Sequence, residues 1–391
     1  MGYVAVKGGQ DAIEFSNKLV DYFRWKGRTK PIELDQARTQ LRLAIDRAMG
    51  EGGLYAPELA ALALLQVEGD SFEAAFHLRA YRATLERRYE SEILNTREMF
   101  VHRRISSTFR DIPGGQILGP TRDYSFRLLN PTLVKHTLGS IEKFLSDLQD
   151  EIDPSKVHEM TTYKKVVDIF LKEGLMQMGA RPDEDRRVFD VTREAIKFPV
   201  PRSAALQMLA RSDTGALMCM AYSTMRGFGE SHGTVGELRV GEAPVRVKDR
   251  RGRIRCIGKI KVSEAEMVGG GGRRGGRAGE NNANRNGKQA AAPRYSIGYG
   301  LCFGQNETKA ICMGMVESAL RSPDSENPAN SQEFVLYHTE VIESYGFTNH
   351  LKLPHYVTFQ AGLEGGRRVE RLKQERAKAT VGAGAQGASN D

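Results

Sequence analysis

Apolar residues recur at every third or fourth position through the first third of the chain, and this period predicts helices. One amphipathic helix is expected over residues 11–24 and a second over residues 33–49. Pro57 is typical of a first helical position and Asp70 of an N-cap, so two further helices are expected to start there. The N-terminal third is therefore predicted to be mainly helical after a short opening strand, YVAVKGG.

Apolar and polar residues alternate in the second half of the chain, which is typical of half-buried strands. ELRVGEAPVRVKD (237–249) and RIRCIGKIKVSEAEMV (253–268) are expected to pair as antiparallel strands. Another strand is expected in RYSIGYGLCFG (294–304), where repeated glycines favour the close approach of another backbone, and a helix over 307–320. The predicted fold class is α+β, a helical N-terminal region followed by mixed helices and short antiparallel strands.

Composition divides the chain into four predicted regions. They are a mainly helical region over 1–130 that ends in a loop rich in glycine and arginine, a variable helical connector over 131–210, an α+β region over 211–364, and a charged helix with a disordered tail over 365–391. A Gly/Arg-rich insertion without a bulky apolar residue interrupts the third region at 269–292. Such a segment buries too little apolar surface to offset the entropy of ordering, so we expect it to be flexible.

The net charge of +8 is concentrated in segments that we expect to be flexible. Residues 268–293 hold five basic residues and one acidic residue, and residues 364–391 hold six basic and four acidic residues. The rest of the chain is close to neutral, which argues against a nucleic-acid-binding surface on the folded part. An RNA-binding role for the RGG-like insertion is the weaker alternative, because the insertion has no aromatic residue to stack on a base.

Four scattered cysteines, none of them in a CxxC pair, fit a reducing cytoplasm better than a disulfide framework. No apolar run reaches the roughly 20 residues that a membrane helix needs. The N-terminus also lacks the basic and apolar regions of a signal peptide. We therefore expect a cytoplasmic protein without a membrane segment.

The segment DIPGGQILGPTRDY, from Asp111 to Tyr124, is a candidate phosphate-binding loop. A Gly-Gly turn exposes backbone N–H groups, and nearby arginines suit phosphate oxygens because they bind them bidentately. No GK[ST] follows, so the segment is not a Walker sequence. A purely structural turn between domains stays open as the alternative.

The segment HLKLPH, from His350 to His355, is a candidate metal-binding pair. Two histidines five positions apart do not share a helical face, but in a turning chain both imidazoles can reach one zinc-like ion. The alternative is two histidines packed under a loop. Since no dedicated cysteines lie nearby, further ligands would have to come from substrate, water or a partner chain.

Several of these segments resemble one known family in their order along the chain and in their residue sequences. They include YVAVKGG, LAIDRAMGEGGLYAPELAALAL, FHLRAYRATL, DIPGGQILGPTRDYSFRLL, GYGLCFG and EFVLYHTEVIESYGFTNHLKLPHYVTFQ. On these motifs the chain is similar to the PhnI family, core subunits of bacterial carbon–phosphorus lyase, over about residues 2–364.

The resemblance implies an activity and a set of partners. It implies a subunit that displaces adenine from ATP by methylphosphonate, forming alpha-D-ribose 1-methylphosphonate 5-triphosphate, and that acts as a nucleosidase when alone. ATP is then a substrate, and a divalent metal, zinc, is expected at His350 and His355. The partners implied are PhnG, PhnH and PhnJ, with PhnK and PhnL. A non-catalytic scaffold subunit of the same complex is the alternative.

That reaction requires groups that hold a triphosphate and a group that assists the departing base. Arginines and backbone N–H groups suit the first task, and the candidates are Arg103, Arg104, Gly114, Gly115 and Arg122. An acid suits the second task, and the sequence does not choose among Asp111, Asp123 and Glu237.

Overall fold

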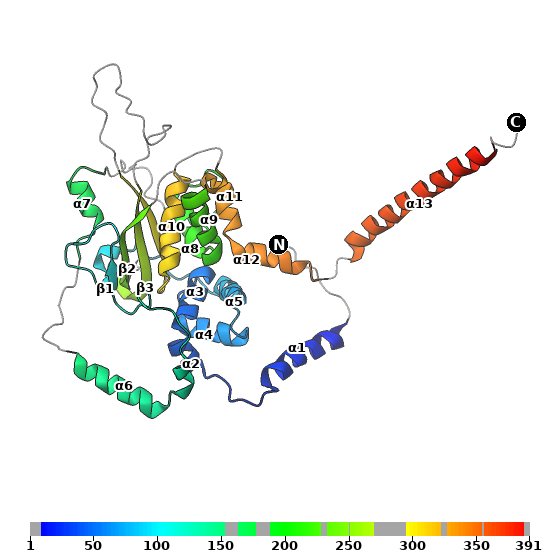
Figure 1. Cartoon of the computed structure of the whole chain (residues 1–391). Helices are drawn as coiled ribbons and strands as arrows, with labels where there is room; N and C mark the ends of the chain where they lie inside the picture. The colour runs from blue at the N-terminus through cyan, green and yellow to red at the C-terminus, as the bar shows by residue number, and fades with distance from the viewer. Residues whose placement is uncertain are drawn as a thin grey trace, which may run out of the picture. The chain divides into compact units, whose positions relative to one another are not determined.

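The computed structural model describes residues 9–152, 163–176, 188–227, 233–249, 251–269, 295–321, 327–353 and 356–386. The chain forms two compact units, Ile32–Ile342 and a second that combines Met1–Pro31 with Glu343–Asp391. The larger unit combines helices with one antiparallel sheet, which confirms the predicted α+β class (Figure 1). Residues 270–292 of the predicted insertion and most of the predicted opening strand lie outside the described residues.

The sheet of the larger unit has four antiparallel strands in sequence order. They are β1 (Phe100–Ile105), β2 (Thr234–Lys248), β3 (Ile254–Gly269) and β4 (Ser296–Phe303). The predicted alternating segments thus form β2 and β3, in a register that pairs Leu238 with Ala265 and Ala265 with Gly300. β1 comes from the predicted region 1–130 and β2 from the region 211–364, so these two regions share one sheet.

Alternation along the strands gives the sheet one apolar and one charged face. Leu238, Ala265 and Met267 belong to the main hydrophobic core, together with residues of the helices on that side. The alternate positions of the same strands, which include Glu237 and Glu264, are also buried but lie on the opposite face of the sheet. Both faces of the sheet are therefore covered, one by apolar and one by charged groups.

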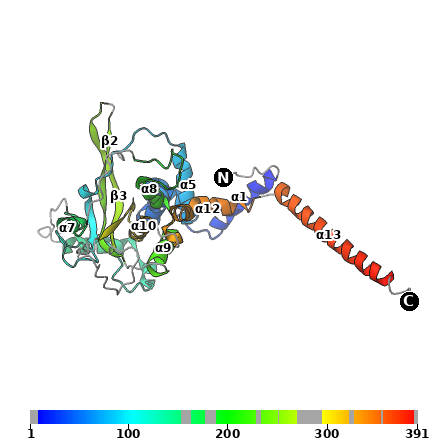
Figure 2. The ribbon, with the colours of Figure 1, turned by 90° about the horizontal axis from the view of Figure 1, so that it is seen from above.

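α10 (Glu307–Leu320) packs directly on the apolar face of the sheet (Figures 1 and 2). α9 (Thr214–Tyr222) packs against α10, and α8 (Arg202–Arg211) contacts both α10 and β4. Side-chain carbons built on Gly298 and Gly300 would overlap the carbonyl oxygens of Gly314 and Ala310 of α10. The expectation that these strand glycines permit close approach of another backbone is confirmed. α11 (Gln332–His338) adds Val335 and Leu336 to the same core.

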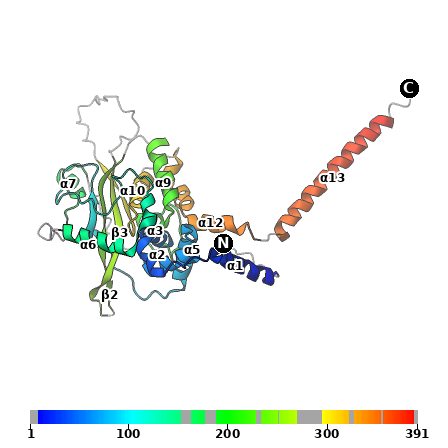
Figure 3. The same ribbon diagram turned by 60° about the horizontal axis from the view of Figure 1, so that its bottom comes forward.

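The helices of the N-terminal third enclose a second core. They are α2 (Leu34–Gln40), α3 (Arg42–Gly52), α4 (Pro57–Gln66) and α5 (Ser71–Thr84), and Figure 3 shows α2, α3 and α5 grouped together. Asp70 caps α5 as expected, because its side chain accepts hydrogen bonds from the N–H groups of Phe72 and Glu73. The helix expected over 33–49 is instead interrupted at Leu41, whose φ of −104° and ψ of 29° depart from helical values.

The remaining elements of the larger unit connect these layers. α6 (Leu138–Glu151) and α7 (Val167–Lys172) lie between β1 and α8 in the chain. Short turns complete the unit, namely η1 (Thr96–Glu98), η2 (Pro131–Lys135), the π-helical turn Ser223–Gly227 and η5 (Pro328–Asn330).

The smaller unit holds α1 (Gln10–Trp25), α13 (Tyr356–Gln386) and most of α12 (Val341–His350). α1 matches the amphipathic helix expected over 11–24 within one residue at each end. Across the described ranges, no helix combines the length and the apolar character that crossing a bilayer requires.

Candidate functional site

Residues 111–123, called the glycine loop below, fold back beside β1. Ile117 forms an isolated antiparallel bridge with Arg104, with N–O distances of 2.7 and 2.8 Å. Gly114 and Gly115 turn the loop with φ values of 86° and 77°, a left-handed conformation that glycine adopts without strain. The N–H of Gly115 donates to Ile112 at 2.8 Å, and a side-chain carbon built on Gly115 would meet no atom within 4 Å. The turn is therefore tight and open on its outer side.

Arg104 of β1 holds the glycine loop from beneath. It is fully buried, and its Nε donates to Glu237 Oε1 at 2.5 Å. Nη1 donates to the carbonyl oxygens of Pro113 (2.6 Å) and Gly115 (3.2 Å), and Nη2 donates to that of Lys164 (2.8 Å). Glu237 neutralises the guanidinium, and Arg104 therefore connects the sheet to the loop through charge-assisted hydrogen bonds.

Arg103, the preceding residue, fixes the far end of the same loop. Its Nε donates to Glu307 Oε2 of α10 at 2.8 Å, and its Nη2 donates to Asp123 Oδ2 at 2.6 Å. Its Nη1 donates to the carbonyl oxygen of Leu118. Arg103 is fully buried as well, so both arginines of the RR pair use their donors on the chain itself.

Besides Asp123, the exposed charged side chains of the glycine loop are Asp111 and Arg122. Within the described residues neither side chain makes a hydrogen bond or an ion pair. Asp123, by contrast, accepts from Arg103 and from Arg127 (3.3 Å). The loop therefore presents the Gly-Gly backbone and the guanidinium of Arg122 to solvent, and these donors can bind phosphoryl oxygens.

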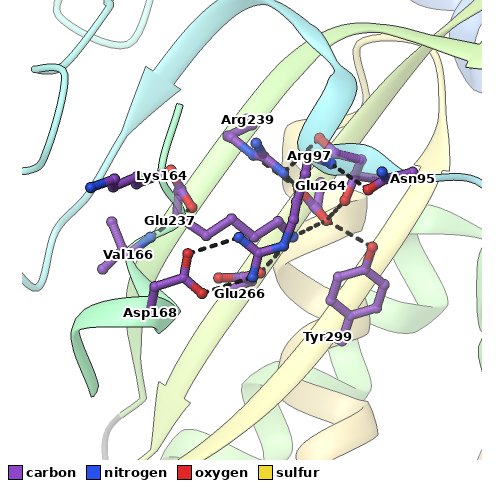
Figure 4. A network of polar contacts seen from close by, with 12 residues as sticks. Asn95, Arg97, Lys164, Val166, Asp168, Glu237, Arg239, Glu264, Glu266 and Tyr299 are labelled. Atoms are coloured by element: carbon purple, nitrogen blue, oxygen red, sulfur yellow. Dashed lines mark hydrogen bonds and ion pairs between the residues drawn. The ribbon is translucent and has the colours of Figure 1, made fainter. Parts of the chain in front are cut away.

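A layer of charged side chains covers the face of the sheet opposite α10 (Figure 4), and Glu237 links this layer to Arg104. Glu264 of β3 is its centre, and its Oε1 accepts from Lys165 Nζ (2.7 Å) and Tyr299 OH (2.8 Å). Thr96 Oγ1 donates to the same oxygen at 2.6 Å, and Arg239 Nε donates to Oε2 at 2.9 Å. One buried carboxylate thus joins β3 to β2, to β4 and to two connecting segments.

The protonation states in this layer follow from burial and from the neighbouring charges. Burial opposes the ionisation of Glu264, but Arg239 and Lys165 outweigh burial and lower the pKa of Glu264 to about 2. Burial raises the pKa of Glu266, although Lys165 Nζ lies 2.8 Å from its Oε1. Burial and the Glu264 carboxylate raise the pKa of Tyr299. Glu264 is therefore an ionised acceptor at neutral pH and Tyr299 a protonated donor to it.

The same layer secures the segment that carries α7. Arg97 donates to both carboxylate oxygens of Asp168 at 2.7 Å, and the N–H of Val166 donates to Glu237 Oε2 at 3.1 Å (Figure 4). Glu237 therefore bonds to Arg104 through one oxygen and to the α7 segment through the other. The motifs of the sequence did not predict this layer, although two glutamates at alternate positions of a buried strand, Glu264 and Glu266, are a detectable signal.

Of the two candidate metal ligands, the structure describes His350, the last residue of α12. Its Nδ1 lies against the carbonyl oxygen of Phe347, and a proton on Nδ1 leaves the lone pair of the ring on Nε2, as a metal ligand requires. His355 lies outside the described residues. No three His, Cys, Asp or Glu side chains in the described ranges gather as a metal site would require. The structure therefore describes one imidazole of the expected pair and no complete ligand set among the described residues.

Comparisons with known proteins agree with the resemblance of the motifs. A family model described as bacterial phosphonate metabolism protein (PhnI) matches residues 2–375. The chain is 42% identical to alpha-D-ribose 1-methylphosphonate 5-triphosphate synthase subunit PhnI of Rhizobium meliloti, over 94% of this chain and 95% of that protein. It is also 42% identical to the subunit of the same name from Escherichia coli, over 95% of this chain and 99% of that protein. With the HtxH protein of Stutzerimonas stutzeri it shares 40% identity over 97% of this chain. The chain therefore belongs to the PhnI family of bacterial phosphonate metabolism proteins.

Proposed function

We propose that this chain is the subunit of carbon–phosphorus lyase that displaces adenine from ATP by methylphosphonate. The product is alpha-D-ribose 1-methylphosphonate 5-triphosphate, and water replaces the phosphonate when the chain acts alone. The observation that carries the proposal is identity of 42% along nearly the whole chain to two proteins named as subunits of that synthase. The exposed glycine loop supports it, because a triphosphate needs N–H and guanidinium donors.

In this reaction the bond between the anomeric carbon of ribose and N9 of adenine breaks. The electron pair leaves with N9, which takes up a proton, and a phosphonate oxygen forms the new bond to the anomeric carbon. The chain has to hold the triphosphate still and to hydrogen-bond the departing base. We assign the first task to the backbone at Gly114 and to Arg122, with Gly115 shaping the turn. Arg103 and Arg104 position the loop from behind.

We assign the second task to Asp111. Of the three acidic candidates, Glu237 is buried against Arg104, and Asp123 accepts from Arg103 and Arg127. Asp111 is exposed, makes no hydrogen bond or ion pair within the described residues and lies three residues before Gly114, so its carboxyl group is the one left open to a bound nucleotide.

Replacing Arg122 with alanine tests the phosphate assignment. A charge-assisted hydrogen bond contributes about 1.5–3 kcal/mol, so we expect the KM for ATP to rise by about tenfold or more. The assay is adenine release by the full chain co-purified with its companion subunits. Arg255→Ala, which removes an exposed arginine from β3, is the matched control and should leave KM unchanged. An ATP KM within about twofold of the wild-type value would assign the loop a structural role only.

We also propose that His350 and His355 bind a divalent metal, with zinc as the expected ion, and that a partner chain or ligand completes the site. An ion held there would supply a Lewis acid. The double variant His350→Ala, His355→Ala should lose at least about half of the bound metal of the purified complex, as measured by elemental analysis. A double variant of His77 and His338, two histidines of the larger unit, should retain it. Metal content unchanged in the first variant would place the ion elsewhere.

We propose PhnG, PhnH and PhnJ, with PhnK and PhnL, as partner subunits. α6 supports this, because it has no buried residue and carries Ile141, Phe144, Leu145 and Leu148 at helical spacing with exposed fractions of 40–61%. A monomer rarely leaves such a stripe in water, so a protein partner is expected to cover it. Co-purification of the tagged chain with each of the five subunits tests the set. A nucleic acid partner is not part of the proposal.

The cytoplasm is the proposed location. All four cysteines are free, which fits a reducing compartment. Recovery of the chain in the periplasmic fraction would contradict this location.

A further inference from the structure

A cavity of about 230 Å³ in the larger unit is not used by the mechanism above. It lies among α3, α5, α8 and the strands β3 and β4, and the segments around Leu94 and Val191 complete its wall. Much of its lining is apolar, from Leu94, Val191, Ile260, Val262, Leu301 and Phe303. It is smaller than the roughly 300–1,000 Å³ typical of sites for drug-sized ligands, so a small ligand fits it best.

Two of the polar side chains in the lining already make hydrogen bonds within the protein. Gln207 donates through Nε2 to the carbonyl oxygen of Phe189 and accepts from the N–H of Val191 at 3.4 Å. Thr192 donates to Asp190 Oδ1 at 2.6 Å. Neither group is arranged to read the polar edge of a nucleobase, which argues against an adenine pocket.

Arg211 of α8 and Arg82 of α5 are the two cations of the lining, and within the described ranges Arg82 makes a single hydrogen bond. Its Nη1 donates to the carbonyl oxygen of Gly53 at 3.1 Å, and in the described part of the chain Arg82 has no ion pair. Burial, and then the like charge of Arg79, lower its pKa. The guanidinium is therefore a partly buried cation whose surroundings contain too little negative charge, and a bound anion would supply that charge.

Lys309 of α10 adds a second cation behind the wall. It is 1% exposed, and its Nζ has no hydrogen-bond partner among the described residues. A side-chain carbon built on Gly50 would lie 3.6 Å from this Nζ, and Gly50 lines the cavity. Burial lowers the pKa of Lys309, so its charged form is disfavoured unless an anion lies close by.

The carboxylates of the neighbourhood are engaged with other arginines. Glu51 and Asp213 accept from Arg47 at 2.9 and 2.8 Å, and Glu340 accepts from Arg79 at 2.5 Å. Asp190, which also attracts Arg82, accepts from Arg87. Among the described residues, Arg82 and Lys309 therefore have no carboxylate partner of their own beside this mainly apolar cavity.

We propose that this cavity is the binding site of the phosphonate substrate, a small dianion with an apolar substituent. Arg82 binds the phosphonate oxygens, Lys309 adds positive charge from behind, and the leucine, valine and isoleucine side chains surround the substituent. The identity of the anion rests on the proposed function. The cavity and the glycine loop are connected through α3, which carries both Gly50 of the cavity and Asp46. Asp46 accepts from the N–H of Gln305 at 2.9 Å, and the side chain of Gln305 donates to the carbonyl oxygen of Pro120 in the loop at 3.1 Å.

The test uses the full chain co-purified with its companion subunits, supplied with ATP and methylphosphonate. For Arg82→Gln we expect the KM for methylphosphonate to rise about tenfold or more, because a charge-assisted contact is lost. We expect the KM for ATP and the release of adenine by water to stay within about twofold of wild type. The product mixture should therefore shift from ribose 1-methylphosphonate 5-triphosphate towards ribose 5-triphosphate. Arg82→Lys should recover part of the affinity, and Arg255→Gln is the matched control.

A comparison of inorganic phosphate with methylphosphonate separates the contribution of the apolar lining to binding from that of the Arg82 cation. If the cavity recognises the substituent, methylphosphonate should protect the complex against thermal unfolding at lower concentration than phosphate, and Arg82→Gln should abolish the difference. Equal protection by both anions, or a methylphosphonate KM unchanged in a folded Arg82→Gln variant, would overturn the assignment. Either result leaves adenine release from ATP intact, whereas failure of the proposed function would abolish that release in the wild-type complex as well.

Discussion

Replacing Gly300 with alanine is expected to lower the free energy of unfolding of the larger unit by about 4 kcal/mol or more. Gly300 lies in β4 opposite Ala265, and a side-chain carbon there would overlap the carbonyl oxygen of Ala310. The obstacle is helix backbone rather than the end of a flexible side chain, so no rotamer change relieves it. α10 would have to move away from the sheet and open the main hydrophobic core.

Chemical denaturation of the purified chain measures this effect. Gly139→Ala is the matched control, since Gly139 lies in α6 and a carbon built on it meets nothing within 4 Å. That change should be neutral or stabilise by up to about 1 kcal/mol through helix propensity. A Gly300→Ala variant as stable as the control would contradict the close packing of α10 on β4.

Replacing Arg104 with methionine is expected to cost about 3–5 kcal/mol, because it leaves the Glu237 carboxylate buried without its cation. The carbonyl oxygens of Pro113, Gly115 and Lys164 lose their donor in the same step. The glycine loop then loses the hydrogen bonds that hold it against β1, so the KM for ATP should rise together with the loss of stability.

A second substitution separates the two effects of Arg104. In the double variant Arg104→Met, Glu237→Leu the unpaired charge is gone, and we expect most of the lost stability to return. The KM for ATP should stay high, because the loop is still unsupported. Denaturation curves and steady-state kinetics on the single and double variants check this. Full recovery of ATP affinity in the double variant would show that Arg104 does not position the loop.

Sequence patterns predicted the parts of the fold that depend on local chemistry. The N-cap at Asp70, the start of α4 at Pro57 and the pairing of β2 with β3 followed from residue type and alternation. The packing role of the glycines in β4 also followed, because a glycine in a strand indicates close approach of another backbone. The break at Leu41 did not, since no proline or glycine marks it.

The roles of buried charges depend on partners far away in the sequence, which a local pattern does not contain. Arg103 and Arg104 are residues of a type that binds phosphate. Their guanidinium groups nevertheless donate to Glu307 and Glu237, which lie more than a hundred positions away in the sequence. The partners of Glu264 and the wall of the cavity beside Arg82 likewise come from several separate segments. Sequence therefore located the glycine loop but did not say which of its charged neighbours are buried.

The most direct test of the account is the set of products that the complete complex forms from ATP and methylphosphonate. The complex is purified with this chain, incubated with both compounds and analysed by mass spectrometry. We predict free adenine together with ribose 1-methylphosphonate 5-triphosphate, and ribose 5-triphosphate when methylphosphonate is left out. An assembled complex that releases no adenine from ATP under either condition would contradict the account.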